Sequence, residues 1–278
     1  MKLYQLSVMI LPVTILAGGC STKQPGSRKQ EKEKKPGEYQ LVWNDEFDYT
    51  GLPDSTKWSY DTEGNADGWG NWEEQFYTEE RIENAKVENG VLRITAIKEP
   101  FQDRHYTSAR LVSRAEWQYG MFEIRAKVPP ARGTWSAIWM MPGGWSYKTG
   151  NWPDVGEFDI MEHVGHDAGL IHASAHSKDY QWQKGTQKTD TIRISDAAES
   201  FHSYIWEWSQ DAVKAYVDDS LYFIYENEGL GESKWPYDKP FYLILNVAVG
   251  GAWAHIEGID DAAFPQTMEI DYVRVYKK

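Results

Sequence analysis

The sequence predicts an all-β fold, in which two mostly antiparallel sheets pack face to face as a sandwich. Several runs alternate apolar with polar residues, which is typical of strands that bury one face. Clusters of Gly, Pro or Asp bound these runs, and no long run repeats apolar residues at helical spacing. Helices should therefore be few and short.

Residues 1–19 have the features of a secretory signal peptide, because Lys2 precedes an apolar stretch that ends in small residues. The stretch is too short for a membrane-spanning helix. Cys20 is the only cysteine, and its place directly after small residues resembles a bacterial lipoprotein processing site, although Ala17 stands where such sites usually carry Leu. We expect a secreted lipoprotein of the cell envelope, anchored to a membrane by lipid at Cys20. Ordinary signal cleavage or an uncleaved leader is the alternative.

Residues 20–38 are expected to form a flexible linker behind the lipidated cysteine. From residue 21 to residue 38 the chain has no aliphatic or aromatic side chain, so this segment cannot bury a core. Residues 39–278 follow without a second linker. We expect them to form one catalytic domain, since all-β domains often reach this length as a single unit.

The composition favours a neutral partner. The formal net charge is −13, which opposes nucleic acid and other polyanions, because proteins that bind phosphate depend on clusters of Lys and Arg. The chain also has 14 Trp and 17 Tyr, more large aromatic side chains than a core of this size needs. Their flat apolar faces with polar edges suit sugar rings.

Seven runs are predicted as strands from their alternation or from their β-branched and aromatic content. The segment Asp218-Asp219-Ser220 is typical of a hairpin turn between two of them. The predicted strands are residues 91–97, 121–128, 201–209, 213–217, 221–225, Phe241–Val249 and 269–276.

A further strand is predicted where three carboxylates fall within six positions. Phe158 and Ile160 alternate with Glu157 and Asp159. Strict alternation would place Glu162 on the opposite face, unless one extra residue bulges out between Asp159 and Glu162. A helix is the competing interpretation, but residues five apart diverge by about 140° around it. We therefore favour a strand with a bulge that brings all three carboxylates to one side.

Three acids on one sheet face repel one another, which raises the pKa of at least one of them. A nucleophile paired with a proton donor is built in this way. An exposed acidic strand without chemistry is the alternative interpretation of the same pattern.

Taken together, the motifs resemble glycoside hydrolase family sixteen, specifically its laminarinase-like bacterial endo-β-glucanases. The resemblance implies an antiparallel, concanavalin-like β-jelly-roll sandwich with an open concave cleft. It covers nearly all of the chain after the linker and rests on residues 42–47, 69–71, 119–123, 139–142, 156–162, 246–251 and 271–276.

The resemblance also implies roles for the three acids. Glu157 corresponds to the nucleophile of the family and Glu162 to its acid/base, with Asp159 between them. A retaining mechanism needs two carboxyls about 5 to 5.5 Å apart, and Asp159 could share a proton with Glu157. The implied sugar contacts are Asn71, Arg110, Trp135, Trp139, Trp152 and His176, with Glu73 and Trp253 at positions where relatives also place cleft residues.

No cofactor is expected for catalysis, but many members of this family bind a structural calcium ion. The matching positions are Glu46, the backbone carbonyl of Gly90, and Asp271. Oxygen ligands of this kind suit Ca²⁺. The alternative is that no ion binds and that ordinary hydrogen bonds satisfy Asp271.

The expected function is retaining hydrolysis of internal linkages in a neutral β-glucan, either β-1,3 or mixed β-1,3/1,4. The protein is expected to be a monomer that binds the polysaccharide. Enzymes of the family that act on sulfated galactans should need basic residues, whereas this domain is acidic. The alternatives are a non-catalytic carbohydrate-binding protein on the same fold, a transglycosylase, and a galactanase.

Overall fold

The computed structural model describes residues 39–148 and 150–278, which lie within the compact unit Gly37–Lys278. The predicted signal peptide, the lipidation site at Cys20 and the linker lie outside the described residues. Within the described part of the chain, no helix has the length and apolar character needed to cross a membrane.

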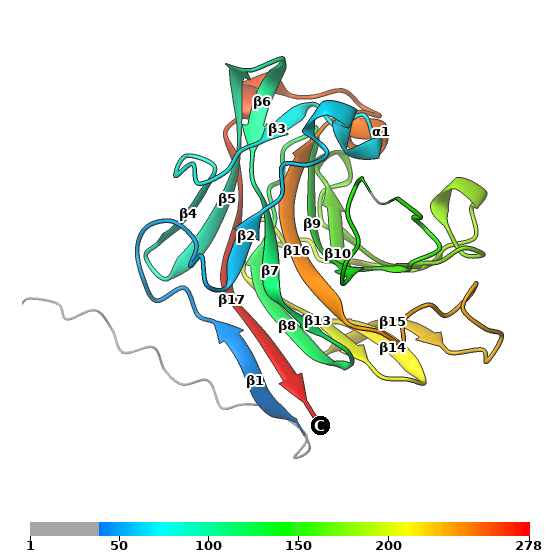
Figure 1. Ribbon diagram of the computed structural model, residues 1–278. Coiled ribbons are helices and arrows are strands. Elements are labelled where there is room, and N and C mark those ends of the chain that lie inside the picture. The colour runs from blue at the N-terminus through cyan, green and yellow to red at the C-terminus, as the bar shows by residue number, and fades with distance from the viewer. Residues whose placement is uncertain (1–38, 149) are drawn as a thin grey trace, which may run out of the picture. The chain divides into compact units, whose positions relative to one another are not determined.

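Two sheets dominate the described domain (Figure 1). The larger sheet has ten strands, of which eight follow one path, while β1 pairs with β17 and β4 pairs with β5. In order along that path the strands are β15 (Ser220–Glu226), β14 (Ala212–Val217), β13 (His202–Trp208), β8 (Gly120–Lys127), β17 (Gln266–Lys277), β5 (Val91–Phe101), β6 (Arg104–Ser108) and β3 (Gln75–Tyr77), with β1 (Gln40–Asp45) and β4 (Ala85–Glu88) beside it.

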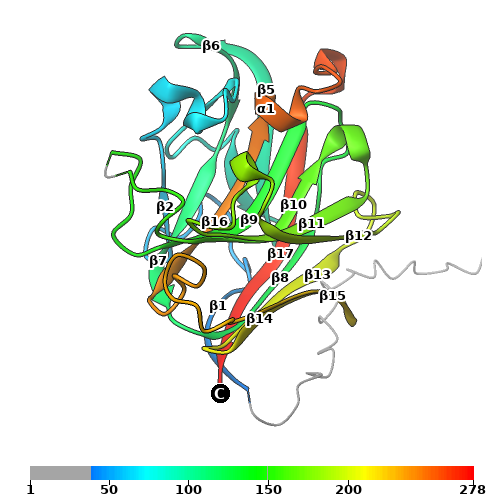
Figure 2. The same ribbon diagram turned by 90° about the vertical axis from the view of Figure 1, so that its right-hand side faces the viewer.

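The second sheet has seven strands, and in Figure 2 its strands β9 to β12 lie above β13 to β15 of the larger sheet. Every pairing in it is antiparallel. Its order is β12 (Lys188–Arg193), β11 (Leu170–His176), β10 (Glu157–Val164), β9 (Thr134–Pro142), β16 (Phe241–Val249), β7 (Arg110–Trp117) and β2 (Trp58–Tyr60).

Helices in the described residues are few and short, as the sequence predicts. The one α-helix, α1 (Gly251–Ala254), has four residues. The others are short 3₁₀ segments, of which the first is interrupted by a kink at Gly68 and Trp69: η1 (Asn65–Gly70), η2 (Gly165–Asp167), η3 (Trp182–Lys184) and η4 (Asp261–Ala263).

The predicted two-sheet sandwich is confirmed, and each predicted strand is present. Phe241–Val249 has the predicted ends, and the other strands have one or both ends shifted by a few residues. The predicted hairpin turn is also confirmed, because Asp218 lies between β14 and β15 with a φ of 53°. The parallel pairing of β3 with β6 is the exception to the antiparallel pattern among the described strands.

Phe158 of β10 ties the two sheets together in the core. Its fully buried ring stacks on Tyr237 with centroids 4.2 Å apart and on Phe241 at 5.2 Å. It also contacts Trp206 and Trp208 of β13, in the opposing sheet, at 5.1 and 5.3 Å. These aromatic contacts add to the hydrophobic burial and hold β10 in a fixed position.

Candidate active site

A cleft of about 800 Å³ runs across the outer face of the seven-stranded sheet. Six neighbouring strands each contribute at least one side chain to it, so the cleft crosses the strands. One lining residue from each of β7, β16, β9, β10, β11 and β12 is, in that order, Arg110, Asn246, Trp139, Glu157, Ser174 and Thr189.

The predicted bulge is present in β10. Against β9, Asp159 faces Trp139 and Met161 faces Ile138, so Ile160 is the extra residue. Against β11 the register shifts in the same interval, between Asp159 and Glu162.

Ile160 and Met161 are consecutive and both belong to the hydrophobic core. A regular strand would instead place Met161 on the face that carries Glu157 and Asp159. Because of the bulge, Glu162 turns back to the cleft, where it lines the same space as the other two acids. The bulge hypothesis is therefore confirmed.

Gly156 sets the entry of the chain into β10. Its φ is +84°, which residues with a side chain rarely adopt, and a Cβ there would lie 2.9 Å from both Pro236 Cγ and Tyr237 Cε1. The glycine lets β10 begin directly against Tyr237, the ring on which Phe158 stacks.

Each of the three acids has its own ring partner. Trp152 Nε1 donates a hydrogen bond to Glu157 Oε2 at 2.6 Å. Trp135 Nε1 donates to Glu162 Oε1 at 3.0 Å. His176 Nε2 lies 3.1 Å from Asp159 Oδ2. The two indole N–H groups favour the ionised form of the carboxylate that they contact.

Burial raises the pKa of all three carboxyls. Burial and then the charge of Asp159 raise the pKa of Glu157 to about 8, while Trp152 and His176 oppose the shift. Burial is also the main reason that the pKa of Glu162 rises to about 7. Burial, with repulsion from Glu162, raises the pKa of Asp159 well above its usual range.

Asp159 can carry a proton, because it is 2% exposed and burial raises its pKa well above its usual range. A side-chain hydrogen bond between the two carboxyls raises the pKa of Glu157 and lowers that of Asp159, so the pair shares a proton. A proton held on Asp159 removes the negative charge that raises the pKa of Glu157. The pair can therefore hold one proton while Glu157 is ionised.

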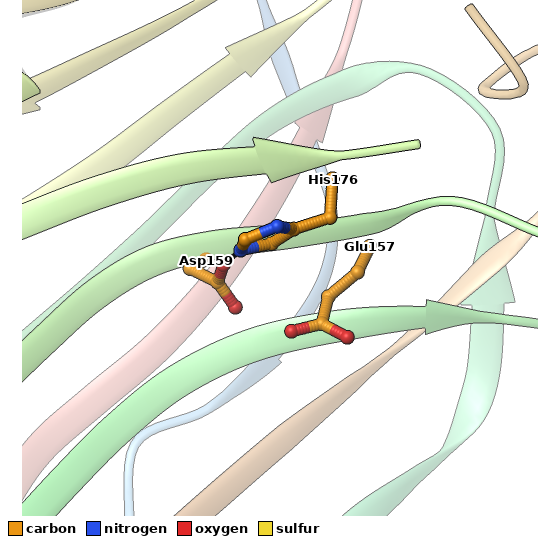
Figure 3. A group of neighbouring side chains, drawn as sticks. All are labelled: Glu157, Asp159 and His176. Carbon is orange, nitrogen blue, oxygen red and sulfur yellow. Dashed lines mark ion pairs between the residues drawn. The ribbon is translucent and has the colours of Figure 1, made fainter. Parts of the chain in front are cut away.

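Figure 3 shows Glu157, Asp159 and His176 with their polar ends drawn together. One potential ligand atom from each lies within 4.8 Å of the others, a grouping that could hold a metal ion. The contacts with Trp152 and between the two carboxyls account for the grouping without one. Acid–base chemistry needs the same side chains.

All six predicted sugar-contact residues line the cleft, as do the two weaker candidates. The structure therefore brings them together with the acids, and sugar binding by them stays a prediction. The residues are Asn71, Arg110, Trp135, Trp139, Trp152 and His176, with Glu73 and Trp253.

Arg110 holds the rings of Trp69 and Trp139 in place on the β7, β16 and β9 side of the cleft. It is 3% exposed, and its guanidinium lies 4.4 Å from the ring centroid of Trp69 and 4.6 Å from that of Trp139. Its Nε pairs with Asp61 at 3.1 Å. The cation between two indoles fixes both rings.

The sequence interpretation missed several residues of the cleft. Asn246 accepts a hydrogen bond from Trp139 Nε1 at 2.7 Å. It is the one polar residue in the apolar run Phe241–Val249, and a buried polar side chain in such a run is a usable signal. The other missed lining residues include His172, Ser174, Trp182, Thr189 and Thr191.

The three predicted calcium ligands lie in or beside strands of the ten-stranded sheet, and none of them lines the cleft. Glu46 follows β1, Gly90 lies between β4 and β5, and Asp271 is in β17. Glu46 accepts hydrogen bonds from Arg274 at 2.8 and 2.9 Å, and Asp271 pairs with Arg125 at 2.7 Å. The oxygen donors suit Ca²⁺, which would compete with the arginines for the carboxylates.

Comparison with known proteins identifies relatives along nearly the whole chain. The sequence model of glycosyl hydrolases family 16 matches residues 72–274. A beta-glucanase of Rhodothermus marinus is 49% identical over 283 residues, which cover 99% of this chain and 96% of that protein.

Solved structures of related enzymes have the same fold as this chain. The laminarinase from Rhodothermus marinus superimposes with a TM-score of 0.82 at 51% identity, covering 86% of this chain and 97% of its own. A mutant of SCLam, a non-specific endo-beta-1,3(4)-glucanase, was co-crystallized with 1,3-beta-D-cellotriosyl-glucose and presents 1,3-beta-D-cellobiosyl-glucose at its active site. It has a TM-score of 0.83 at 44% identity, covering 87% of this chain and 96% of its own.

The raised pKa values predict a pH-dependent cost in stability. At and below the ordinary glutamate pKa of 4.5 the carboxyls are protonated, so burying them lowers the free energy of unfolding only slightly. As the pH rises through the raised pKa values, the folded state loses stability relative to the unfolded chain. Glu157→Gln removes one buried charge from the folded state. The Tm of this variant at pH 8 should therefore exceed that of the wild type by about 2–4 °C.

Thermal unfolding at pH 5 and pH 8 measures this difference. Glu226→Gln, which changes an exposed glutamate on β15 of the other sheet, is the matched control and should leave the Tm unchanged. A Glu157→Gln variant less stable than the wild type at pH 8 would contradict the account.

Proposed function

We propose that this chain, which belongs to glycosyl hydrolases family 16, is a retaining endo-β-glucanase that hydrolyses internal β-1,3 and mixed β-1,3/1,4 linkages. Its fold is the β-jelly roll of the family's laminarinases. The observation that carries the proposal is the bulge in β10, which brings the buried Asp159 and the half-buried Glu157 and Glu162 to one side of a cleft that crosses the sheet.

In the proposed reaction, Glu157 attacks the anomeric carbon and Glu162 gives its proton to the departing glycosidic oxygen. The bond from the anomeric carbon to that oxygen breaks as the bond to the carboxylate of Glu157 forms. Glu162, now ionised, then takes a proton from water, which attacks the same carbon and releases Glu157. The configuration is retained because two displacements occur.

This division of roles depends on where Asp159 keeps its proton. With Asp159 ionised, the pKa of Glu157, about 8, lies above that of Glu162, about 7, and a proton on Asp159 removes the charge that raises the pKa of Glu157. A pKa of about 7 keeps a proton on Glu162 up to neutral pH. The indole of Trp152 favours the ionised form of Glu157. Asp159 holds the proton that would otherwise sit on Glu157, so the nucleophile stays charged in a buried site.

The cleft supports cleavage within a chain, because lining residues extend over three strands on one side of β10 and two on the other. Apart from the acids, the lining is mainly indole, hydroxyl and amide groups, with Arg110 as a cation already paired to Asp61. Such a lining suits a neutral glucan better than a sulfated galactan.

Loss of either catalytic carboxyl should abolish turnover. Glu157→Gln and Glu162→Gln should each lower kcat on laminarin by at least about 10³-fold, because general acid–base and nucleophilic steps contribute on this scale. Release of reducing ends measures the effect, and Glu226→Gln is the control with unchanged activity.

The same assay distinguishes the proposed hydrolase from the alternative functions. Both variants with full activity would refute the proposed roles. Wild-type protein that binds laminarin without new reducing ends would be a carbohydrate-binding protein. Products longer than the starting oligosaccharide would identify a transglycosylase.

Two indole substitutions should shift opposite limbs of the pH profile. Trp135→Phe removes a hydrogen bond that lowers the pKa of Glu162. The pKa of the acid should rise, so activity should persist to higher pH. Trp152→Phe removes the corresponding donor to Glu157. The nucleophile should then need a higher pH to ionise, so the acidic limb should move up.

Profiles of kcat/KM against pH measure both limbs, and we expect shifts of up to about one pH unit. Each variant is the control for the other. If Trp135→Phe moved the acidic limb and Trp152→Phe moved the alkaline one, the two carboxyls would have exchanged roles.

We also propose that Glu46, the carbonyl of Gly90 and Asp271 hold a calcium ion with a structural role. Support comes from the oxygen donors themselves, Asp271 in β17 of the ten-stranded sheet with Glu46 and Gly90 next to the strand ends of β1, β4 and β5. Calcium at about 100 times its Kd should stabilise the folded state by about 2.7 kcal/mol, so chelation by EDTA should lower the Tm. Asp271→Asn is the matched variant, and an identical Tm with calcium and with EDTA would refute the site.

A further inference from the structure

The two arms of the cleft differ in chemistry. On the β9, β16 and β7 side the lining is aromatic, with Trp139 and Trp69 on either side of Arg110. On the β11 and β12 side it is polar. We call the group Ser174, Gln187, Thr189 and Thr191 the hydroxyl arm. In Figure 2, β10, β11 and β12 run side by side, and β12 is the edge of the sheet.

The side chains of the hydroxyl arm are neighbours on one face of the sheet, at β11 and β12. Gln187, Thr189 and Thr191 alternate along the chain, so they share one face. Ser174 lies opposite Thr189 in register and donates to Thr189 Oγ1 at 3.0 Å. Thr189 in turn donates to the carbonyl of Ala173 at 3.0 Å. The hydroxyl groups of Ser174 and Thr189 are thus held in place before any ligand arrives.

Trp182 is the aromatic ring on this side of the cleft. It lines the cleft from η3 and is 45% exposed. Trp58, Trp69 and Trp206 are by contrast almost fully buried. A large exposed indole at the edge of a sugar-binding cleft has the form of a stacking platform, since its flat face is apolar and its edge is polar.

The loop that carries Trp182 is braced. Gly185, in the left-handed conformation with a φ of 63°, donates its N–H to the carbonyl of Trp182 at 2.9 Å. The Thr186 hydroxyl donates to the carbonyl of Asp179 at 2.7 Å. Ser233 donates to the carboxylate of Asp179 at 2.9 Å. A ring on a pre-ordered loop loses little conformational entropy when a ligand binds.

We propose that Trp182 stacks on a sugar ring at an outer subsite on the β12 side of the cleft and thereby gives the enzyme a preference for long glucan chains. Trp182 lies in the loop between β11 and β12, whereas the acids are on β10. We therefore expect a short oligosaccharide bound at the acids to leave the indole free and a longer chain to reach it. This inference rests on the proposed function.

A series of β-1,3-gluco-oligosaccharides from three to seven units tests it. Trp182→Ala should raise KM for the heptasaccharide and for laminarin by about 10-fold, while kcat/KM for the trisaccharide stays within about twofold of the wild type. Trp182→Tyr, which keeps an aromatic face, should restore most of the loss. Trp72→Ala, which removes a tryptophan that is 74% exposed and does not line the cleft, is the matched control and should show no chain-length effect.

Binding gives a readout that does not depend on turnover. In the Glu157→Gln background, calorimetry with the heptasaccharide should show Kd rising about 10-fold on addition of Trp182→Ala. Equal Kd values, or an equal loss at every chain length, would overturn the subsite while leaving the proposed hydrolysis intact. If the wild type failed to hydrolyse glucans, the proposed function would fall, and the binding comparison would still decide whether Trp182 contacts the chain.

Discussion

A strand alternates its side chains, and this site needs three carboxyls on one face within six residues. Ile160 resolves the conflict, because as the extra residue of a bulge it returns Glu162 to the side of Glu157 and Asp159. The arrangement carries a cost, since burial raises the pKa of all three groups. The rest of the domain holds these charges where an unsupported strand would move them apart.

The support comes from two directions. Below the strand, Phe158 packs against Tyr237 and against Trp206 of the opposing sheet, so β10 cannot shift without opening the core. Above it, Trp135 and Trp152 each donate a hydrogen bond to one glutamate. The indoles therefore stabilise charge as well as offering surface to a sugar, and their substitution should change acid–base behaviour as well as affinity.

Much of this could be predicted from the sequence, because period-two alternation and the local spacing of acids are properties of short segments. The two-sheet sandwich, the bulge and the hairpin turn at Asp218 belong to this group. β1 to β4, β6, β7, β9, β11 and β12 escaped prediction. β9 is buried along most of its length and β11 is rich in small residues, so neither alternates clearly, while β12 is a mostly exposed edge strand. The loop that carries Trp182 is held in part by the hydrogen bond from Ser233 to Asp179, a contact between distant segments that no local pattern records.

The central claim is that the bulge makes Glu157 the group that bonds to the sugar and Glu162 the group that protonates the leaving oxygen. The most direct test is to trap the glycosyl–enzyme with a β-glucan oligosaccharide that carries fluorine at C2 and an activated leaving group, and to map the label by mass spectrometry. The account predicts a single label on Glu157. A label on Glu162 or on Asp159 would contradict it.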